Sequence, residues 1–337
     1  MVKSFFKRLT NKLDRNHNHY FNSTLKDLQK EYKEAYDAIE IEIIKWYKAM
    51  DEIKATNPNF KFSELKHLEA LTKQINLILE ELSRLEVELV GTNLNQLYVS
   101  DYMDLAKLNE KYRSVANSPM PGVNQLNSTQ LLEFYMNMQQ ANADMTEIVK
   151  NLELSWWYSP IHGKWFNTRI EERAKKLGYS IESKLKQAII RGDGYNKVAG
   201  QLMKDLDISF QSAKTLVATE LRTAEIAAKI HNAKQLGYTH MQRRSMRDSH
   251  VCKMCQEMDG TIYPLDAVTA GDFMLHPNDR CILVEVVVDE KGEPKRSQYY
   301  EEAQEFIKQR AKENEERANK IREQYYLNKK NKKNKKK

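Results

Sequence analysis

Apolar residues recur at helical spacing over two long stretches in the first third of the chain. In residues 22–54 they fall at steps of three and four positions, and over residues 63–90 leucines and isoleucines line a single face. The segment NPNF at 57–60 separates the two stretches, because a proline disfavours helical geometry in the residue before it. We therefore predict two long helices, the second ending at Gly91, since glycine suits the left-handed conformation of a helix end. Shorter helices are expected at residues 95–115 and 128–150.

The helical pattern becomes more regular in the second half of the chain. Gly192 and Gly194 predict a turn. The polar residues around Ser209 predict another, because a serine accepts hydrogen bonds from the free amides that open a helix. These turns divide residues 180–236 into three predicted helices, and Gly237 ends the last of them.

Two segments further along the chain have the composition of strands. They are YTHMQRRSM at 238–246 and CILVEVVVD at 281–289, and they flank a segment that contains all three cysteines. Residues 297–327 predict a charged helix with too few apolar positions for deep burial. The expected fold is mainly α, with long N-terminal helices in a bundle or a rod. A C-terminal three-helix segment, a small α+β module resembling a zinc knuckle and a disordered basic tail complete it.

Changes in composition divide the chain into five expected segments. Three of the four tryptophans lie in LSWWYSPIHGKWFNTR at 154–169, where the helical pattern breaks. The segments are a helical N-terminal region (1–153), the helical part of a C-terminal module (154–240), a cysteine/histidine β-knuckle (241–290), a charged helix (291–328) and a disordered lysine-rich tail (329–337).

Positive charge is concentrated at the end of the sequence. The formal net charge is +7, and the last nine residues, KKNKKNKKK, hold seven lysines; without them, 47 basic residues balance 47 acidic ones. A block of like charges is typical of a disordered arm that contacts polyanions, so we expect non-specific binding of double-stranded DNA that weakens with salt. The alternative is a tail that serves only solubility. The expected DNA-binding residues are Lys329, Lys330, Lys332, Lys333, Lys335, Lys336 and Lys337.

The remaining composition bears on the compartment. The sequence has no apolar run of the length that a signal peptide or a membrane span needs. Three cysteines are an odd number, which argues against a disulfide framework. We therefore expect assembly in a reducing cytoplasm, with neither a membrane nor a small-molecule substrate as a partner.

The cysteine segment carries a candidate metal site. Cys252 and Cys255 are separated by two residues, which lets both sulfurs turn toward one point, and His276 and Cys281 follow after a loop. Three thiolates and one imidazole complete a tetrahedral shell with no open position. Such a shell is typical of a structural Zn²⁺ ion, which replaces the core that a small polar module cannot build.

Other interpretations of this segment remain open. The two-residue spacing also occurs in redox sites, although those open a helix after a strand, and here a turn at Asp259 and Gly260 follows closely. Cys281 paired with His276 is a possible nucleophile, but no third group that orients the histidine is indicated. A last alternative is three reduced thiols without a metal. Asp248, ahead of the first cysteine, is expected to accept hydrogen bonds from turn amides.

The order of these motifs resembles the C-terminal region of the phage Mu F-like minor head proteins, also called phage head morphogenesis proteins. The resemblance rests on the helix with TELRTAEIAAKIHNAKQLGY, the paired cysteines, EMDG and HPNDRC, within residues 180–288. The family usually has Cys-Arg-Cys after His-Pro, whereas Asp279 stands here at the first of those cysteines. The departure removes one potential ligand and makes the zinc prediction depend on His276.

The resemblance implies a structural protein of a tailed bacteriophage, assembled in the cytoplasm of the host bacterium and carried inside the capsid. It implies association with the portal protein and with other capsid or scaffold proteins, and a role in DNA packaging or ejection. No catalytic residues are predicted. The alternative is a metal-dependent nuclease in which His276 and Asn278 form part of a His-Asn-His site, although a further metal ligand is not evident.

Overall fold

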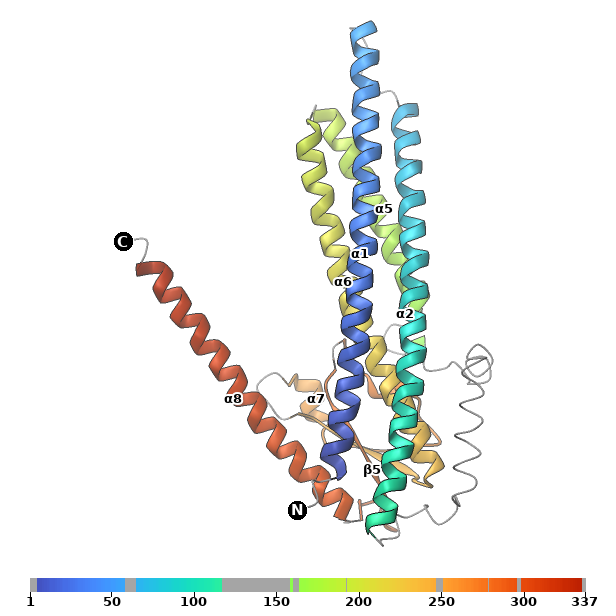
Figure 1. Cartoon of the computed structure of the whole chain (residues 1–337), viewed down its shortest axis with the longest axis vertical. Coiled ribbons are helices and arrows are strands. Elements are labelled where there is room, and N and C mark those ends of the chain that lie inside the picture. The colour runs from blue at the N-terminus through green and yellow to red at the C-terminus, as the bar shows by residue number, and fades with distance from the viewer. Residues whose placement is uncertain are drawn as a thin grey trace. The chain divides into compact units, whose positions relative to one another are not determined.

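The structure is a computed structural model that describes residues 5–57, 65–116, 158–159, 164–191, 193–246, 251–277, 279–295 and 298–334. It is mainly helical (Figure 1), and its helices are α1 (Phe5–Thr56), α2 (Leu65–Ala116), α5 (Phe166–Arg191), α6 (Tyr195–Gln235), α7 (Lys253–Glu257) and α8 (Gln298–Asn334). The remaining elements are β1 (Tyr158–Ser159), β2 (Lys164–Trp165), β3 (His240–Arg244), β4 (Ile262–Pro264), β5 (Ile282–Val286) and the short 3₁₀ helix η3 (Ala270–Phe273). None of the helices in these ranges is both long and apolar enough to cross a bilayer.

Two long N-terminal helices are confirmed, but the predicted end of the second at Gly91 is wrong. Helix α2 continues through Gly91 to Ala116 and includes the segment 95–115 that was expected to be separate. A Cβ atom at Gly91 would lie 3.5 Å from the ring of Phe166, so this glycine gives room for the start of α5 rather than a helix end. The helix predicted at 128–150 lies outside the described residues.

The three helices predicted between residues 180 and 236 are two. Helix α5 ends at Arg191, close to the expected glycine turn, but α6 passes through Ser209 without interruption. Ser209 is buried, and its hydroxyl lies 3.2 Å from the hydroxyl of Tyr32. The polar residue that indicated a helix start instead forms a buried hydrogen bond.

The described chain groups into two compact units. The bundle unit contains the described residues of 17–97 and 157–224, and the sheet unit contains those of 1–16, 98–156 and 225–337. Each unit is assembled from segments that are far apart in the sequence.

Parts of α1, α2, α5 and α6 lie side by side in the bundle unit and share one apolar core (Figure 1). Each helix has an apolar stripe at three- and four-residue spacing, and burying these stripes together drives their association. The buried core residues include Ile39, Ile43, Trp46, Leu71, Ile75, Leu79, Ile181, Leu185, Val198, Leu202 and Leu206.

Ionised groups also cross the interior of the bundle unit. Arg173 of α5 pairs with Glu86 of α2, and the hydroxyl of Tyr32 donates to the same carboxylate at 3.2 Å. Burial, together with the charge of Glu86, raises the pKa of Tyr32 to about 12, which keeps its hydroxyl protonated. A second buried pair, Arg169 with Glu220, joins α5 to α6. Because a buried charge without a partner is costly, these pairs favour one alignment of the helices.

The sheet unit contains a three-stranded antiparallel sheet in the order β4-β3-β5. Opposite residues include His240 with Val286 and Arg244 with Ile282 on one side of β3, and Gln242 with Ile262 on the other. The two strands predicted on either side of the cysteine segment are thus confirmed and pair with each other. Every residue of β5 is buried, including Glu285, whose carboxylate lies 4.0 Å from the buried ammonium of Lys229 on α6.

Helices α6 and α8 pack against this sheet, and the start of α1 packs against α8. Phe6 of α1 meets Phe306 of α8 edge to face, with ring centroids 5.5 Å apart. Lys229 of α6 is buried and donates to the backbone carbonyl of Leu283 in β5. The first turns of α8 are therefore fixed in the unit.

The lysine-rich end departs from the prediction of a disordered tail. Helix α8 continues to Asn334, so the backbone of 329–334 is helical, and residues 335–337 lie outside the described residues. Lysine is a good helix former, and the segment has no glycine or proline that would end the helix.

Candidate metal centre

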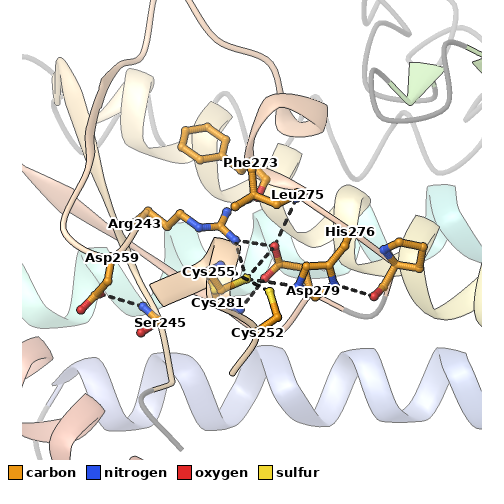
Figure 2. A network of polar contacts seen from close by, with 11 residues as sticks. Arg243, Ser245, Cys252, Cys255, Asp259, Phe273, Leu275, His276, Asp279 and Cys281 are labelled. Atoms are coloured by element: carbon orange, nitrogen blue, oxygen red, sulfur yellow. Dashed lines mark hydrogen bonds and ion pairs between the residues drawn. The ribbon is translucent and has the colours of Figure 1, made fainter. Parts of the chain in front are cut away.

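Helix α7 positions the first two thiols. Cys252 is the N-cap of this helix, in extended conformation (φ −72°, ψ 160°), and its Sγ accepts a hydrogen bond from the backbone N–H of Cys255 at 3.3 Å. Cys255 is buried, whereas Cys252 is exposed. The two-residue spacing thus brings both sulfurs to the same side of the helix (Figure 2).

His276 joins this pair from the loop before β5. Its Nε2 lies 3.1 Å from the Sγ of Cys255, and its Nδ1 lies 2.8 Å from the carbonyl oxygen of Pro277. Donation from Nδ1–H to that carbonyl leaves Nε2 as the unprotonated atom that faces the sulfurs, which is the tautomer a metal ligand requires. The ligand atoms of Cys252, Cys255 and His276 all lie within 4.8 Å of one another.

A second group of potential ligands shares Cys255 with the first. The ligand atoms of Cys255, Asp279 and Cys281 lie within 4.8 Å of one another, and all three residues are buried. The four residues predicted as ligands are therefore all in the cluster, with Cys281 connected to the others through Cys255. In the second group, the carboxylate of Asp279 lies next to the sulfurs of Cys255 and Cys281.

Asp279 is held by a network that is not evident from the sequence (Figure 2). Its Oδ1 accepts from the backbone N–H of Cys281 at 2.8 Å, and its Oδ2 accepts from the backbone N–H of Leu275 at 3.2 Å and pairs with Arg243. Arg243 of β3 is 1% exposed; it also donates to the carbonyl of Phe273 and lies 3.5 Å from the Sγ of Cys255. One guanidinium therefore links β3, η3, α7 and the start of β5.

This environment shifts the pKa values of the cysteines and of Asp279 in different directions. Burial, reinforced by the charge of Asp279, raises the pKa of the Cys255 and Cys281 thiols above the ordinary value. Hydrogen bonding from the Cys255 backbone N–H lowers the pKa of Cys252. Burial acts against the carboxylate of Asp279, but Arg243 and the N–H of Cys281 hold its pKa below the ordinary value. Without a cation the buried thiols are neutral, whereas a bound metal favours their thiolate form.

Cys252, Cys255 and His276 have the ligand types and the spacing of a metal site. Ligands at about 2.0–2.3 Å from zinc in tetrahedral arrangement are about 3.5 Å apart, close to the 3.1 Å between His276 Nε2 and Cys255 Sγ. Cys252, Cys255 and His276 offer two sulfurs and one nitrogen within 4.8 Å of one another, whereas Cys281 falls in the second group and shares only Cys255 with the first. Asp279 belongs to the second group of potential ligands, and its carboxylate is also paired with Arg243.

The position of Cys252 at the start of α7 also bears on the redox interpretation. That interpretation requires a helix that follows a strand and begins at the first cysteine. Helix α7 has Cys252 as its N-cap, but it does not directly follow β3, which ends at Arg244, so the criterion is met only in part. The approach of His276 and Cys281 favours a metal, because a redox pair does not need them.

The turn that follows α7 aligns the segment with β3. Asp259 accepts from the backbone N–H of Ser245 at 2.9 Å, and Gly260 has a φ of 89°, which favours glycine. The backbone N–H of Gly260 donates to the carbonyl of Arg243 at 2.8 Å, so the turn fixes the strand that carries this arginine. Asp248 and Asn278 lie outside the described residues.

These observations define a class of protein: a helical chain that carries a small sheet module with a partly buried sulfur–imidazole cluster, which consists of Cys252, Cys255, His276 and Cys281. Residues 179–284 match the model of a family described as phage Mu protein F like protein. This match confirms the resemblance to that family for the stretch from α5 to β5. No curated protein and no solved structure matches the chain. Helices α1, α2 and α8 lie outside the matched stretch.

Proposed function

We propose that the chain is a minor structural protein of a tailed bacteriophage head, carried inside the capsid. The observation that carries this proposal is the family match over residues 179–284, which includes the whole sulfur–imidazole cluster. The cluster is made of side chains that hold one another, which suits a structural module.

Zn²⁺ is the ion that we propose for this cluster. Cys252, Cys255, His276 and Cys281 would hold it, and it would supply cross-links among α7, the His276 loop and β5. A small sheet with a polar loop gains folding free energy from such cross-links, since the ligands converge only in the folded chain. The proposal gives the ion no part in a reaction.

The proposed partners are the portal protein, other capsid or scaffold proteins and double-stranded DNA. Support for DNA comes from the lysine-rich segment 329–337, which holds seven positive charges. Support for protein partners comes from the family match, and the long helices outside it offer extended surfaces for such contacts. Aid to DNA packaging or ejection is the role that these contacts would serve.

The test is the location of the chain in phage particles. Proheads and mature particles of the phage that encodes it would be purified, treated with nuclease, washed in high salt and analysed by quantitative mass spectrometry. We expect the chain in both, at far fewer copies than the major capsid protein. Its absence from both kinds of particle would contradict the proposal.

A further inference from the structure

An open groove runs between α2 and α5 on the surface of the bundle unit. Two adjoining hollows of about 470 and 610 Å³ form it, and both are lined by Asn76 and Glu80. The α2 side extends from Leu68 to Val87, which is about 28 Å of helix. The groove is thus long enough to receive a helical surface rather than a small ligand.

The register of the two helices follows from their closest approaches. A Cβ atom at Gly178 would lie 2.7 Å from Asn76, and Gly91 lies against Phe166. The two helices are therefore antiparallel. A residue of α2 and a residue of α5 lie at the same level along the groove when their residue numbers add to about 255.

Charged side chains line both rims of the groove at matching levels. Along one direction, the α2 rim carries Glu69, Lys73, Glu80 and Arg84, and the α5 rim carries Lys186, Glu182, Lys175 and Glu171. Each level has one acidic and one basic residue, and the sign alternates along each rim. Four acids and four bases leave no net charge, so the rims do not select a polyanion such as DNA.

Some of the charged residues on the rims form ion pairs within their own helix, and these pairs can be replaced by ion pairs with a partner. Lys186 pairs with Glu182 at 2.5 Å within α5, and Arg84 pairs with Glu81 at 2.6 Å within α2. Such exposed pairs contribute little to stability, so exchanging them for contacts across an interface has a small cost.

Two large exposed side chains lie at the midpoint of the charge pattern. Leu77 of α2 is 49% exposed and Tyr179 of α5 is 72% exposed. The α2 charges are symmetric about the position between residues 76 and 77, and the α5 charges about the position between 178 and 179. If a second copy of either rim is turned end to end about this midpoint and laid against the first, each charge faces a charge of opposite sign. On α2, for example, Glu69 then faces Arg84 and Lys73 faces Glu80.

We propose that two copies of this chain pair through the groove about a two-fold axis at this midpoint. A two-fold interface must be complementary to itself, and this face is. An axis along the groove sets each α2 rim against the partner's α5 rim, and an axis across it sets like rims together in reverse. Both arrangements match opposite charges at every level and join the exposed Leu77 and Tyr179 of the two copies.

Sedimentation equilibrium of the full chain at near-physiological salt tests the pairing. We expect a dimer that forms between about 1 and about 100 μM. Leu77→Asp and Tyr179→Asp are each expected to weaken it at least tenfold, since the centre of an interface contributes most of its free energy. Ile208→Asp is the matched control: Ile208 is 66% exposed on α6 and does not line the groove, so dimerisation should not change.

Charge exchange tests the electrostatic match and identifies the axis. Glu80→Lys should weaken the dimer in either arrangement. Adding Lys175→Glu should restore it if α2 faces the partner's α5, and adding Lys73→Glu should restore it if α2 faces the partner's α2. Circular dichroism would verify that each variant is folded. The proposal is overturned if the chain stays monomeric over this range, if Leu77→Asp with Tyr179→Asp leaves the dimer intact, or if neither exchange restores it.

Discussion

At the scale of single residues, Asp279 lies in a buried position among sulfur atoms, where an unpaired carboxylate would be unstable. Arg243 supplies the compensating charge from β3, 36 positions earlier in the chain. The pair also uses its hydrogen bonds to hold the backbone of Leu275 and Cys281, so it fixes the loop that carries His276. The buried acid at position 279 is thus accompanied by a buried arginine.

Removing this arginine should destabilise the sheet unit strongly. We expect Arg243→Met to lower the free energy of unfolding by about 3 kcal/mol, because it leaves the charge of Asp279 buried without a partner. The measurement is thermal and urea unfolding of the full chain.

The matched control for Arg243→Met is Lys253→Met. Lys253 forms a 3.7 Å pair with Glu257 at 89% side-chain exposure, so its loss should cost less than about 1 kcal/mol. Adding Asp279→Leu to Arg243→Met should recover part of the lost stability, since it removes the unpaired charge. Unchanged unfolding of Arg243→Met would show that the pair is dispensable.

Metal content tests the cluster directly. Elemental analysis of freshly purified protein should find about one zinc per chain. Cys252→Ser and His276→Ala should each reduce the zinc content, because a closed tetrahedral shell loses a ligand, whereas Lys253→Met should retain it. A chain purified without chelator that contains no zinc would contradict the assignment.

The candidate site was predictable from the sequence only in part. Close spacing brought Cys252 and Cys255 to one helix end, and the His-Pro motif indicated His276. Arg243 was not predictable, because adjacent arginines stand at 243 and 244 and only the pairing of β3 with β5 decides which one is enclosed.

At the scale of elements, helical periodicity located the long helices but not their ends. Gly91 and Ser209 are residues of the kind that end or begin helices, yet both lie inside continuous helices. Each is explained by a contact with a distant segment, Phe166 for the glycine and Tyr32 for the serine. Local sequence does not contain such contacts, so tertiary packing overrode the local signal.

Helix alignment in the bundle unit should depend on its buried ion pairs. We expect Glu86→Gln to lower the free energy of unfolding by about 3 kcal/mol, because Arg173 and Tyr32 both lose a charged partner in the interior. Chemical denaturation followed by circular dichroism measures the change.

Glu42→Gln provides the comparison, since the pair of Glu42 with Lys45 is on the surface of α1 and its loss should cost less than about 1 kcal/mol. Equal effects of the two substitutions would show that the position of the Glu86 pair in the interior is unimportant.

At the scale of the whole molecule, the chain is formally neutral apart from its lysine-rich end. We expect the full chain to bind double-stranded DNA at low salt, and deletion of 329–337 to abolish this binding. Replacing the lysines one at a time should reduce the slope of log affinity against log salt by about 0.9 for each phosphate that is no longer neutralised.

Two variants of full length separate charge from length in this test. Replacing the seven terminal lysines by glutamine should mimic the deletion, whereas replacing them by arginine should preserve binding. Electrophoretic mobility shift over a salt series is the measurement. Equal binding by the deleted and full-length chains would place the DNA contacts elsewhere or exclude them.

The matched stretch 179–284 is divided between the two units, with 179–224 in the bundle unit and 225–284 in the sheet unit. Its first part completes an apolar core with α1 and α2, and its second part lies in a unit closed by Phe6 and Phe306, all outside the stretch. Genetic recombination that exchanged only the codons for residues 179–284 would therefore encode two apolar cores that each lack part of their residues. Inheritance of this module should proceed together with its flanking helices, which constrains how such genes exchange segments.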